Sequence, residues 1–146
     1  MLHSSFHHNV ADGIDFDAYT SKSVAYNNTC YNNSRHGIFM EEGASSNTIV
    51  GNTCHSNAAC ALCQGSAVAG MSSDNAVISN TLHGHMCVGG SSWEHRTVGF
   101  LGVDNEMGGY DLRSAGWVEQ SVVEANRNFG GVSDFHCSAE GQKNCT

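Results

Sequence analysis

A repeat of about 24 residues constrains the fold of this chain more than any other feature of its sequence. The segment Gly13–Asp17 aligns with Gly37–Glu41 at an offset of 24 residues. The segment Val24–Cys30 aligns with Thr48–Cys54 at the same offset, and with Ala76–Leu82 a further 28 residues on. Every copy of the second segment contains Asn-Thr, and the extra residues of the last copy fall in the loop over residues 64–71. The register therefore predicts a chain built from stacked coils.

Each repeat contains short apolar segments separated by Gly, Asn and Ser, which is typical of short β-strands joined by turns. The repeats lack 3.6-residue periodicity, so a helical solenoid is excluded. The chain has no proline, which suits central strands that need every backbone N–H. We predict an all-β protein, a right-handed parallel β-helix with coils about 4.8 Å apart. At this repeat length the chain makes about six coils.

Two columns of aligned residues indicate what holds the coils together. Asn28, Asn52 and Asn80 share one position, where each side-chain amide can bond to the next along the stack. Such an asparagine ladder satisfies buried polar groups, and the alternative is that these are solvent-exposed turn residues. Cys30 aligns with Cys54, and we expect both to pack as small apolar core residues.

We expect one β-helix domain over residues 1–146, with clear repeats in 12–92 and irregular coils and a closing tail in 93–146. Further strands are expected at 98–100 and within 117–123, and a turn at 126–129. Both ends of a solenoid need a cap, and nothing in Met1–Ala11 is typical of one. We therefore expect an N-terminally truncated piece of a longer β-helix.

Composition restricts the partners of this chain. With 6 basic and 14 acidic residues, its net charge is -8. Nucleic acid and anionic membrane surfaces are disfavoured, because phosphate binding needs clustered Lys and Arg. No apolar run approaches the roughly 18 residues of a membrane-spanning helix. We expect a monomer whose partner is a polysaccharide.

The cysteines and sequons favour an extracellular, secreted protein, although the first residues lack a basic and apolar leader. There are 7 cysteines, and Asn-x-Ser/Thr occurs at Asn27, Asn32 and Asn144. We interpret Cys60-x-x-Cys63 as a local disulfide or as two small packed residues, in preference to a metal or redox site. Cys137 and Cys145 are expected to close the tail. The His and Cys spacings predict no metal site.

The outward face of the first coils is the candidate site. Alternation along residues 14–17 points Ile14 and Phe16 inward and Asp15 and Asp17 outward. The same alternation one coil later points Phe39 and Glu41 outward, so that Asp17 lies beside Glu41. The candidate set is Asp12, Asp15, Asp17, Glu41 and Glu42, with Arg35 and His36 at the entrance to the second coil.

These residue types suit chemistry on an acidic polysaccharide. As catalytic residues we predict Asp15 as base or charge-neutralising carboxylate, Asp17 as its partner and His36 as proton shuttle or substrate contact. Arg35 would clamp a substrate carboxylate. Asp12 and Glu41 would bind substrate or Ca²⁺, which neutralises the carboxylate of a uronic acid. The alternative is that the acidic residues form a solvated face that keeps the protein soluble.

Several segments resemble a known family. Asp12–Asp15, Ser23–Asn28 and Ser34–Ile38 resemble the β-helix repeats of pectin-lyase-like carbohydrate-active proteins, and within these the catalytic modules of mannuronan C5-epimerases. The resemblance covers residues 12–57, about a third of the chain. It implies a right-handed β-helix fold and lyase or epimerase chemistry on polyuronates.

The resemblance allows two alignments of the catalytic coil. Such epimerases have a coil reading Tyr-Gly-Phe-Asp-Pro-His, whose Tyr, Asp and His do the chemistry, and an Arg-His-Gly further along that contacts substrate. If Gly-apolar-Asp is aligned, Asp15 takes the place of the catalytic Asp, Asp12 replaces the Tyr, and Asp17 replaces the His. If Arg35–Gly37 is aligned with Arg-His-Gly instead, the catalytic coil lies upstream of Met1. The activating Lys of the family is missing in both alignments.

The sequence thus predicts a carbohydrate-active β-helix, a polyuronate lyase or C5-epimerase-like protein, and leaves open whether it is an enzyme. The alternatives are a non-catalytic glycan-binding or surface module, or an inactive fragment of a longer enzyme. A β-helix fold by itself supports all of these functions.

Overall fold

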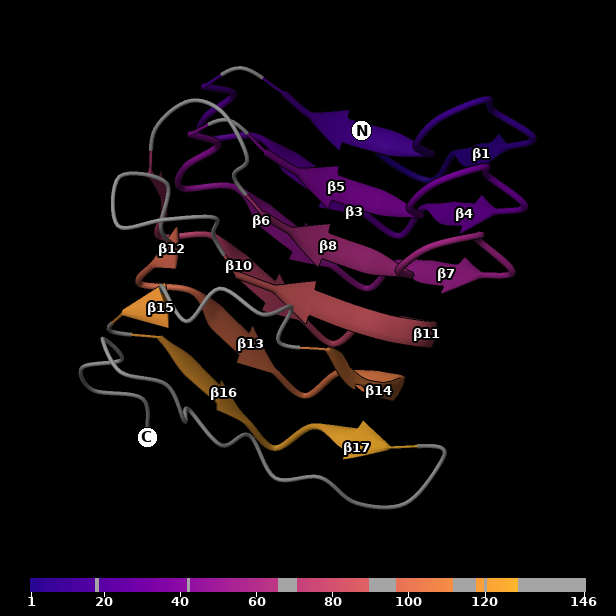
Figure 1. The fold of residues 1–146 in the computed structure, drawn as a ribbon. Helices are drawn as coiled ribbons and strands as arrows, with labels where there is room; N and C mark the ends of the chain where they lie inside the picture. Colours follow the sequence, from indigo (N-terminus) through magenta and orange to yellow (C-terminus); the bar gives the residue numbers. More distant parts are fainter. Residues whose placement is uncertain are drawn as a thin grey trace.

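The computed structural model is a parallel β-helix, drawn in Figure 1 as strands stacked along the axis of the coil. It describes residues 1–17, 19–41, 43–65, 71–89, 97–111, 118–119 and 121–128. These residues contain strands and no helix, and the pairs of strands are parallel. Within them, no helix is long and apolar enough to cross a membrane. The all-β fold predicted from the repeat is confirmed.

The strands form faces that run along the stack. The first face comprises β1 (Ser5–His7), β4 (Thr29–Tyr31), β7 (Thr53–His55), the start of β11 (Thr81–Val88), β14 (Glu106–Asp111) and β17 (Arg127–Asn128). The second face comprises β2 (Ile14–Phe16), β5 (Ile38–Met40), β8 (Leu62–Gln64) and the end of β11. The third face comprises β3 (Val24–Tyr26), β6 (Thr48–Val50), β10 (Ala76–Ile78), β13 (Leu101–Val103) and β16 (Val122–Glu124). A short sheet of β9 (Ser72–Ser73), β12 (Thr97–Val98) and β15 (Val118–Glu119) closes the later coils.

The predicted register is confirmed and extends further than expected. Val24 pairs with Thr48 and Thr48 with Ala76, as the repeat requires. The same column continues to Leu101 and Val122, so regular coils run past residue 92. Strand β12 ends at Val98, the first residue of the strand expected at 98–100, and β13 begins just after that range at Leu101. Strand β17 occupies part of the turn expected at 126–129. Five strands stack on the third face, so the described residues make slightly fewer than the six coils expected.

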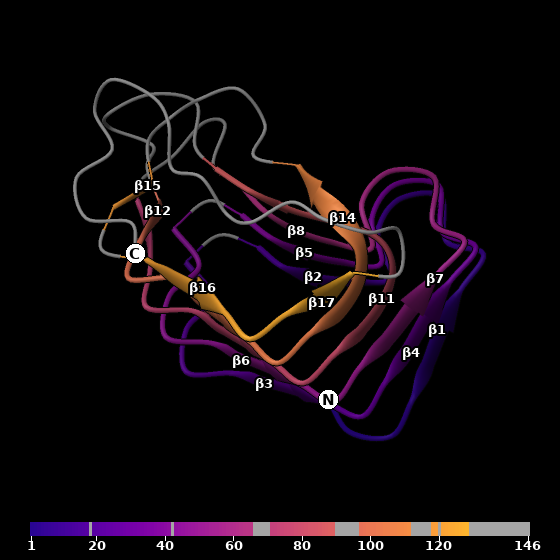
Figure 2. The ribbon, with the colours of Figure 1, turned by 90° about the horizontal axis from the view of Figure 1, so that it is seen from below.

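One corner of the solenoid differs between early and late coils. In the early coils a turn separates the first face from the second, over residues 8–13, 32–37 and 56–61. Seen from below in Figure 2, these turns form nested loops beside β1, β4 and β7. In the next coil the turn is absent, because β11 runs without a break from Thr81 to Val88. The stack of turns therefore ends above β11.

Asparagine ladders connect the coils, as the sequence predicts. The backbone N–H and side-chain amide of Asn28 both donate to Asn52 Oδ1, at 2.9 and 3.0 Å. Asn52 bonds to Asn80 in the same way, at 2.8 and 3.0 Å. The ladder continues to Asn105 and Asn126, which was not foreseen. A second ladder joins Asn9, Asn33 and Asn57. Because Asn28, Asn52 and Asn80 are buried, the alternative of exposed turn residues is wrong.

The interior is filled by aligned apolar columns. Ile14 pairs with Ile38 and Phe16 with Met40, and all of these are buried as predicted. Cys30 pairs with Cys54 inside the first face, and both thiols are buried. The hydrogen bond with Cys30, burial, and repulsion from a charge on Cys30 together raise the pKa of Cys54 well above its ordinary value. This pair is therefore inert core, as expected.

We expect Asn52→Ala to lower the free energy of unfolding by about 3 kcal/mol. The substitution removes the partner of two buried Asn28 groups. It also deprives Asn80 Oδ1 of its side-chain donor, while the backbone N–H of residue 52 remains. The matched control is Asn9→Ala at the exposed end of the second ladder, for which we expect a loss below about 1 kcal/mol. Urea unfolding followed by circular dichroism measures both values. Equal losses would contradict the ladder as the main link between coils.

Candidate functional site

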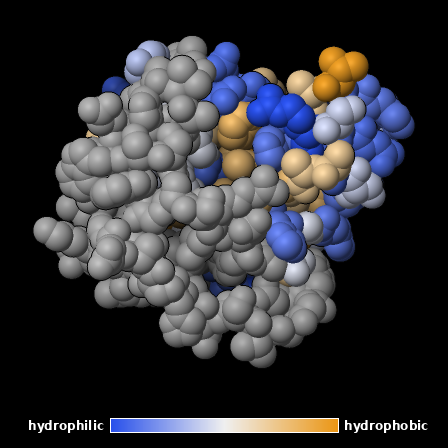
Figure 3. Space-filling model, in the orientation of Figure 1, coloured by the Kyte–Doolittle hydropathy of each residue, from blue (hydrophilic) through white to orange (hydrophobic). Residues whose placement is uncertain are grey.

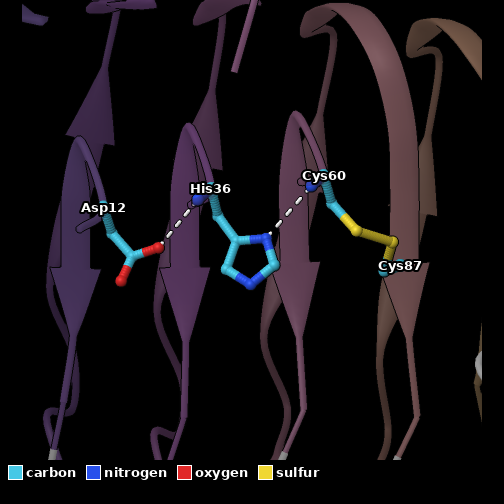
Figure 4. Close-up of a disulfide and its surroundings, with 4 residues drawn as sticks. All are labelled: Asp12, His36, Cys60 and Cys87. Carbon is cyan, nitrogen blue, oxygen red and sulfur yellow. Dashed lines mark hydrogen bonds between the residues drawn. A yellow bond between two sulfur atoms is a disulfide. The ribbon is translucent and has the colours of Figure 1, made fainter. Parts of the chain in front are cut away.

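A column of side chains in the corner turns brings Asp12, His36 and Cys60 together, one from each early coil (Figure 4). The backbone N–H of His36 donates to Asp12 Oδ1 at 2.9 Å. The backbone N–H of Cys60 in turn donates to His36 Nδ1 at 3.1 Å. His36 Nδ1 thus accepts a hydrogen bond, so the neutral ring carries its proton on Nε2. Asp12 and His36 act here as ladder residues, like the asparagines of the neighbouring columns.

Arg35 and Phe39 cover this column from outside. Arg35 Nη1 lies 3.2 Å from Asp12 Oδ2, and the Asp12 side chain is only 3% exposed. The guanidinium lies over the Phe39 ring at 5.1 Å, and the His36 ring is 4.8 Å from the same ring. Phe39, which alternation places on the outside, is therefore buried, with 7% of its surface exposed. The carboxylate that Arg35 clamps in this structure belongs to the chain itself.

The glycines that follow Asp12 and His36 have a packing role. A Cβ added to Gly37 would lie 2.4 Å from the Ala61 carbonyl oxygen, and one added to Gly13 would lie 2.6 Å from the Gly37 carbonyl oxygen. Any side chain at these positions would separate adjacent coils. The Asp-Gly and His-Gly pairs of the sequence are thus explained by close stacking, without any appeal to catalysis.

The acidic residues of the strand end differ in their surroundings. Asp15 and Asp17 are exposed, as predicted, and Glu41 is half-buried. Asp15 lies beside Phe39 in register, and the next residues along place Asp17 beside Glu41. Asp15 also lines a pocket of about 230 Å³ at the N-terminal end of the stack, together with Met1, Phe16, Thr20, Ser23 and Val24. Glu42 lies outside the described residues.

The predicted site residues therefore fall into two groups. The first, Asp12, Arg35 and His36, is joined by contacts within the chain. The second, Asp15, Asp17 and Glu41, follows the outer edge of β2 and β5. Asp12 Oδ1 and Oδ2 face His36 and Arg35, so this carboxylate is poorly suited to binding calcium. Among the described residues, the ligand atoms of His36, Cys60 and Cys63 lie within 4.8 Å of one another. No three carboxylates of the described residues form such a group.

The disulfide in this region joins Cys60 to Cys87 of the next coil. The alternative of a local disulfide between Cys60 and Cys63 is therefore wrong, and Cys63 carries a thiol whose sulfur lies within 4.8 Å of the Cys60 sulfur. Cys63 is in register with Cys87, on adjacent strands β8 and β11. Cys137 and Cys145 lie outside the described residues.

The first face carries an aromatic ladder that the sequence analysis did not single out. His7, Tyr31, His55 and His83 occupy one outward column in register. Tyr31 stacks on His7 at 4.7 Å and on His55 at 5.1 Å, while His55 meets His83 edge-on at 6.5 Å. His7 and His83 are exposed, and Tyr31 and His55 are half-buried. Nδ1 of His7 contacts Nδ1 of His8, and Nδ1 of His55 contacts Ser56 Oγ.

A column of hydroxyl groups runs beside this ladder. Ser5, Thr29, Thr53 and Thr81 are the matching outward residues two positions earlier on the same strands. Together the two columns make an array of hydroxyl groups and imidazole or phenol rings over β1, β4, β7 and the start of β11. The hydroxyl column ends at Thr81, and the next residues in register are the charged Glu106 and Arg127. In Figure 3, hydrophilic residues dominate the right-hand part of the described surface, where Figure 1 places β1 and β4. The repeat Thr-x-Tyr, Thr-x-His, Thr-x-His, at residues 29–31, 53–55 and 81–83, was a signal for this array.

A parallel solenoid whose coils are joined by inward asparagine ladders defines the class of β-helix proteins. The model of the right-handed β-helix region matches residues 1–131, and the chain belongs to this family. The predicted right-handed parallel β-helix is thereby confirmed. Searches of curated proteins and of solved structures each found no significant match.

Two substitutions at Asp12 separate its ladder role from its charge. Asp12→Asn keeps an acceptor oxygen for the His36 N–H, and we expect it to change the free energy of unfolding by less than about 1 kcal/mol, because Arg35 is 49% exposed. Asp12→Ala leaves a partly buried N–H unpaired, and we expect a loss of about 2 kcal/mol. Chemical unfolding measures both, and equal losses would show that the charge is what matters.

Proposed function

We propose that this β-helix is a non-catalytic module that binds a hydroxyl-rich, uncharged polysaccharide along its first face. The observation that carries the proposal is the double column of threonine hydroxyls and of polar edges of Tyr31 and its histidine neighbours. These groups donate and accept hydrogen bonds, which are the interactions that sugar hydroxyls need. A net charge of -8 further disfavours an acidic polysaccharide as the ligand.

The spacing of the array suits a repeating ligand. Neighbouring strands lie about 4.8 Å apart, so each of the four coils from β1 to β11 presents a hydroxyl group and an aromatic ring at a constant interval. A linear polysaccharide that crosses the strands can repeat the same contacts on successive coils. Weak contacts to single sugar units then add up along one polysaccharide chain, because each bound sugar holds the next one close to the protein surface.

The rigidity of the array favours binding. Tyr31 is held on both ring faces by stacking, and the strands that carry it are fixed by the ladders within. Side chains that are already ordered lose little entropy when a ligand binds, which improves affinity without new contacts. An ordered array of hydroxyl groups and aromatic rings over four coils is thus better suited to adhesion along a polymer than to cleavage of one bond.

The packing of the predicted catalytic set also supports a binding role. Asp12 and His36 hold adjacent coils together, and Arg35 is paired with Asp12. A proton shuttle at His36 could not use Nδ1 without losing the hydrogen bond that this atom accepts from the Cys60 N–H. The roles of proton shuttle and substrate clamp would therefore compete with contacts that stabilise the fold.

We expect Tyr31→Ala to weaken binding of a neutral polysaccharide by about tenfold, because it removes the central ring of the aromatic ladder. The matched control is Tyr26→Ala, which removes an exposed tyrosine that contacts a histidine on the third face. Thr53→Val and its third-face counterpart Thr48→Val test the hydroxyl column in the same way. Affinity electrophoresis against neutral and uronic polysaccharides measures all four variants. Equal weakening by variants of both faces, or no binding to any polysaccharide, would contradict the proposal.

A second candidate is action on a polyuronate, which the exposed Asp15 and its pocket of about 230 Å³ favour. In this case Asp15→Ala abolishes turnover of alginate or pectate while the far-UV circular dichroism spectrum stays the same. Product absorbance at the new double bond detects a lyase, and the epimer ratio by NMR detects an epimerase. If the unaltered chain gives neither product absorbance nor a changed epimer ratio but still binds glycan, the result supports the non-catalytic binding module.

A further inference from the structure

We infer that His36, Cys60, Cys63 and Cys87 form a zinc site of the three-cysteine, one-histidine type when the Cys60–Cys87 disulfide is reduced. Ligand atoms of His36, Cys60 and Cys63 lie within 4.8 Å of one another. Cys87 Sγ is bonded to Cys60 Sγ and so belongs to the same cluster. Thiolates at about 2.3 Å from a tetrahedral zinc ion lie about 3.8 Å apart, so small side-chain shifts convert the cluster into a metal site.

The fold, rather than the local sequence, assembles these residues. His36 and Cys60 are stacked in the column of corner turns, where Asp12 precedes them (Figure 4). This column ends at Cys60, because β11 has no turn beneath it. Cys87 on β11 therefore reaches Cys60 from the next coil, and Cys63 is the in-register neighbour of Cys87.

A disulfide alone does not explain the composition of the cluster. Cys63 is a third sulfur beside the bonded pair, at a column position that is Asp15 and Phe39 in the preceding coils. Sulfur and imidazole are the ligands that zinc prefers, and calcium and magnesium prefer oxygen. Cys60, Cys87 and His36 are buried, while Cys63 is half-buried and offers access from the surface.

The contrast with the other cysteine pair supports the assignment. Cys30 and Cys54 are also aligned, yet they are buried inside the first face with a raised pKa at Cys54. Apolar burial disfavours thiolates and hence metal binding. The cluster at the corner has a histidine, a third cysteine and contact with the surface, and the core pair has none of these.

The conversion is balanced when a small thiol serves as reductant. Two reductant molecules form their own disulfide while the Cys60–Cys87 bond breaks, and each of the two cysteines takes up one proton. Zinc binding then displaces one proton from each of the three thiols to solvent. Since His36 Nδ1 now accepts the Cys60 N–H, ligation by His36 rearranges that hydrogen bond, which makes it the weakest of the four ligands.

The test uses the full chain reduced with excess thiol and then freed of reductant without air. We expect one zinc ion per chain by elemental analysis, and a cobalt-substituted form whose sulfur-to-metal absorption corresponds to three thiolates. Cys63→Ser should lower zinc affinity by about 100-fold or more. His36→Asn keeps an acceptor for the Cys60 N–H, as asparagine does in the ladders, and should weaken binding less than Cys63→Ser. Calcium should not compete.

Cys54→Ala is the control, since it removes a thiol of the core pair and should leave zinc binding unchanged. Absence of zinc from the reduced chain would overturn the inference, as would binding unaffected by Cys63→Ser. Equal weakening by Cys54→Ala and Cys63→Ser would also overturn it, because this result indicates capture by an unfolded chain. The oxidised chain should bind no zinc, and binding at full affinity would show that the disulfide and the metal do not compete for the same sulfurs.

Discussion

The hydrogen bonds that run from coil to coil through buried asparagine side chains are what the rest of this structure depends on. Each inward turn would otherwise bury a polar backbone N–H without a partner, at a cost of about 1–3 kcal/mol. In the main ladder an amide oxygen accepts from both the backbone and the side chain of the preceding asparagine. Because the next coil repeats the arrangement, the strands of all faces are held in one register, and outward side chains are aligned with it.

The same requirement explains why a motif suggestive of catalysis has a structural role here. Asp12 and His36 stand in a column that needs an acceptor for the backbone N–H of the next coil, and each supplies one. Gly37 permits the close approach of the carbonyl of Ala61. Aspartate, histidine and glycine are also the residue types of many active sites, so a single sequence cannot distinguish a structural role from a catalytic one. The hydrogen-bond partners of Asp12 and His36 make this distinction in the structure.

Alignment by the ladders has different consequences on different faces. On the first face it converts the repeat Thr-x-aromatic into a continuous array, which suits a polymer with its own repeat. At the corner it creates an interruption, because the column of turns ends where β11 begins. There Cys60 meets Cys87 rather than another turn residue, and Cys63 lies alongside. The array on the first face thus results from the alignment of the coils, and the cysteine cluster results from the turn that is absent at β11.

The sequence by itself determined the class of fold, the register over residues 12–92, the Asn28 ladder and the inward or outward direction of Ile14 to Asp17. These follow from periodicity, which is visible in one dimension. Later coils were not predictable in register, because their offsets shorten and their apolar positions vary. Only the tertiary structure decided that Asp12 is nearly buried, that Phe39 lies beneath Arg35, and that Cys60 pairs with Cys87. Each of these depends on which residue of the next coil lies alongside, and a missing turn changes that neighbour without a clear mark in the sequence.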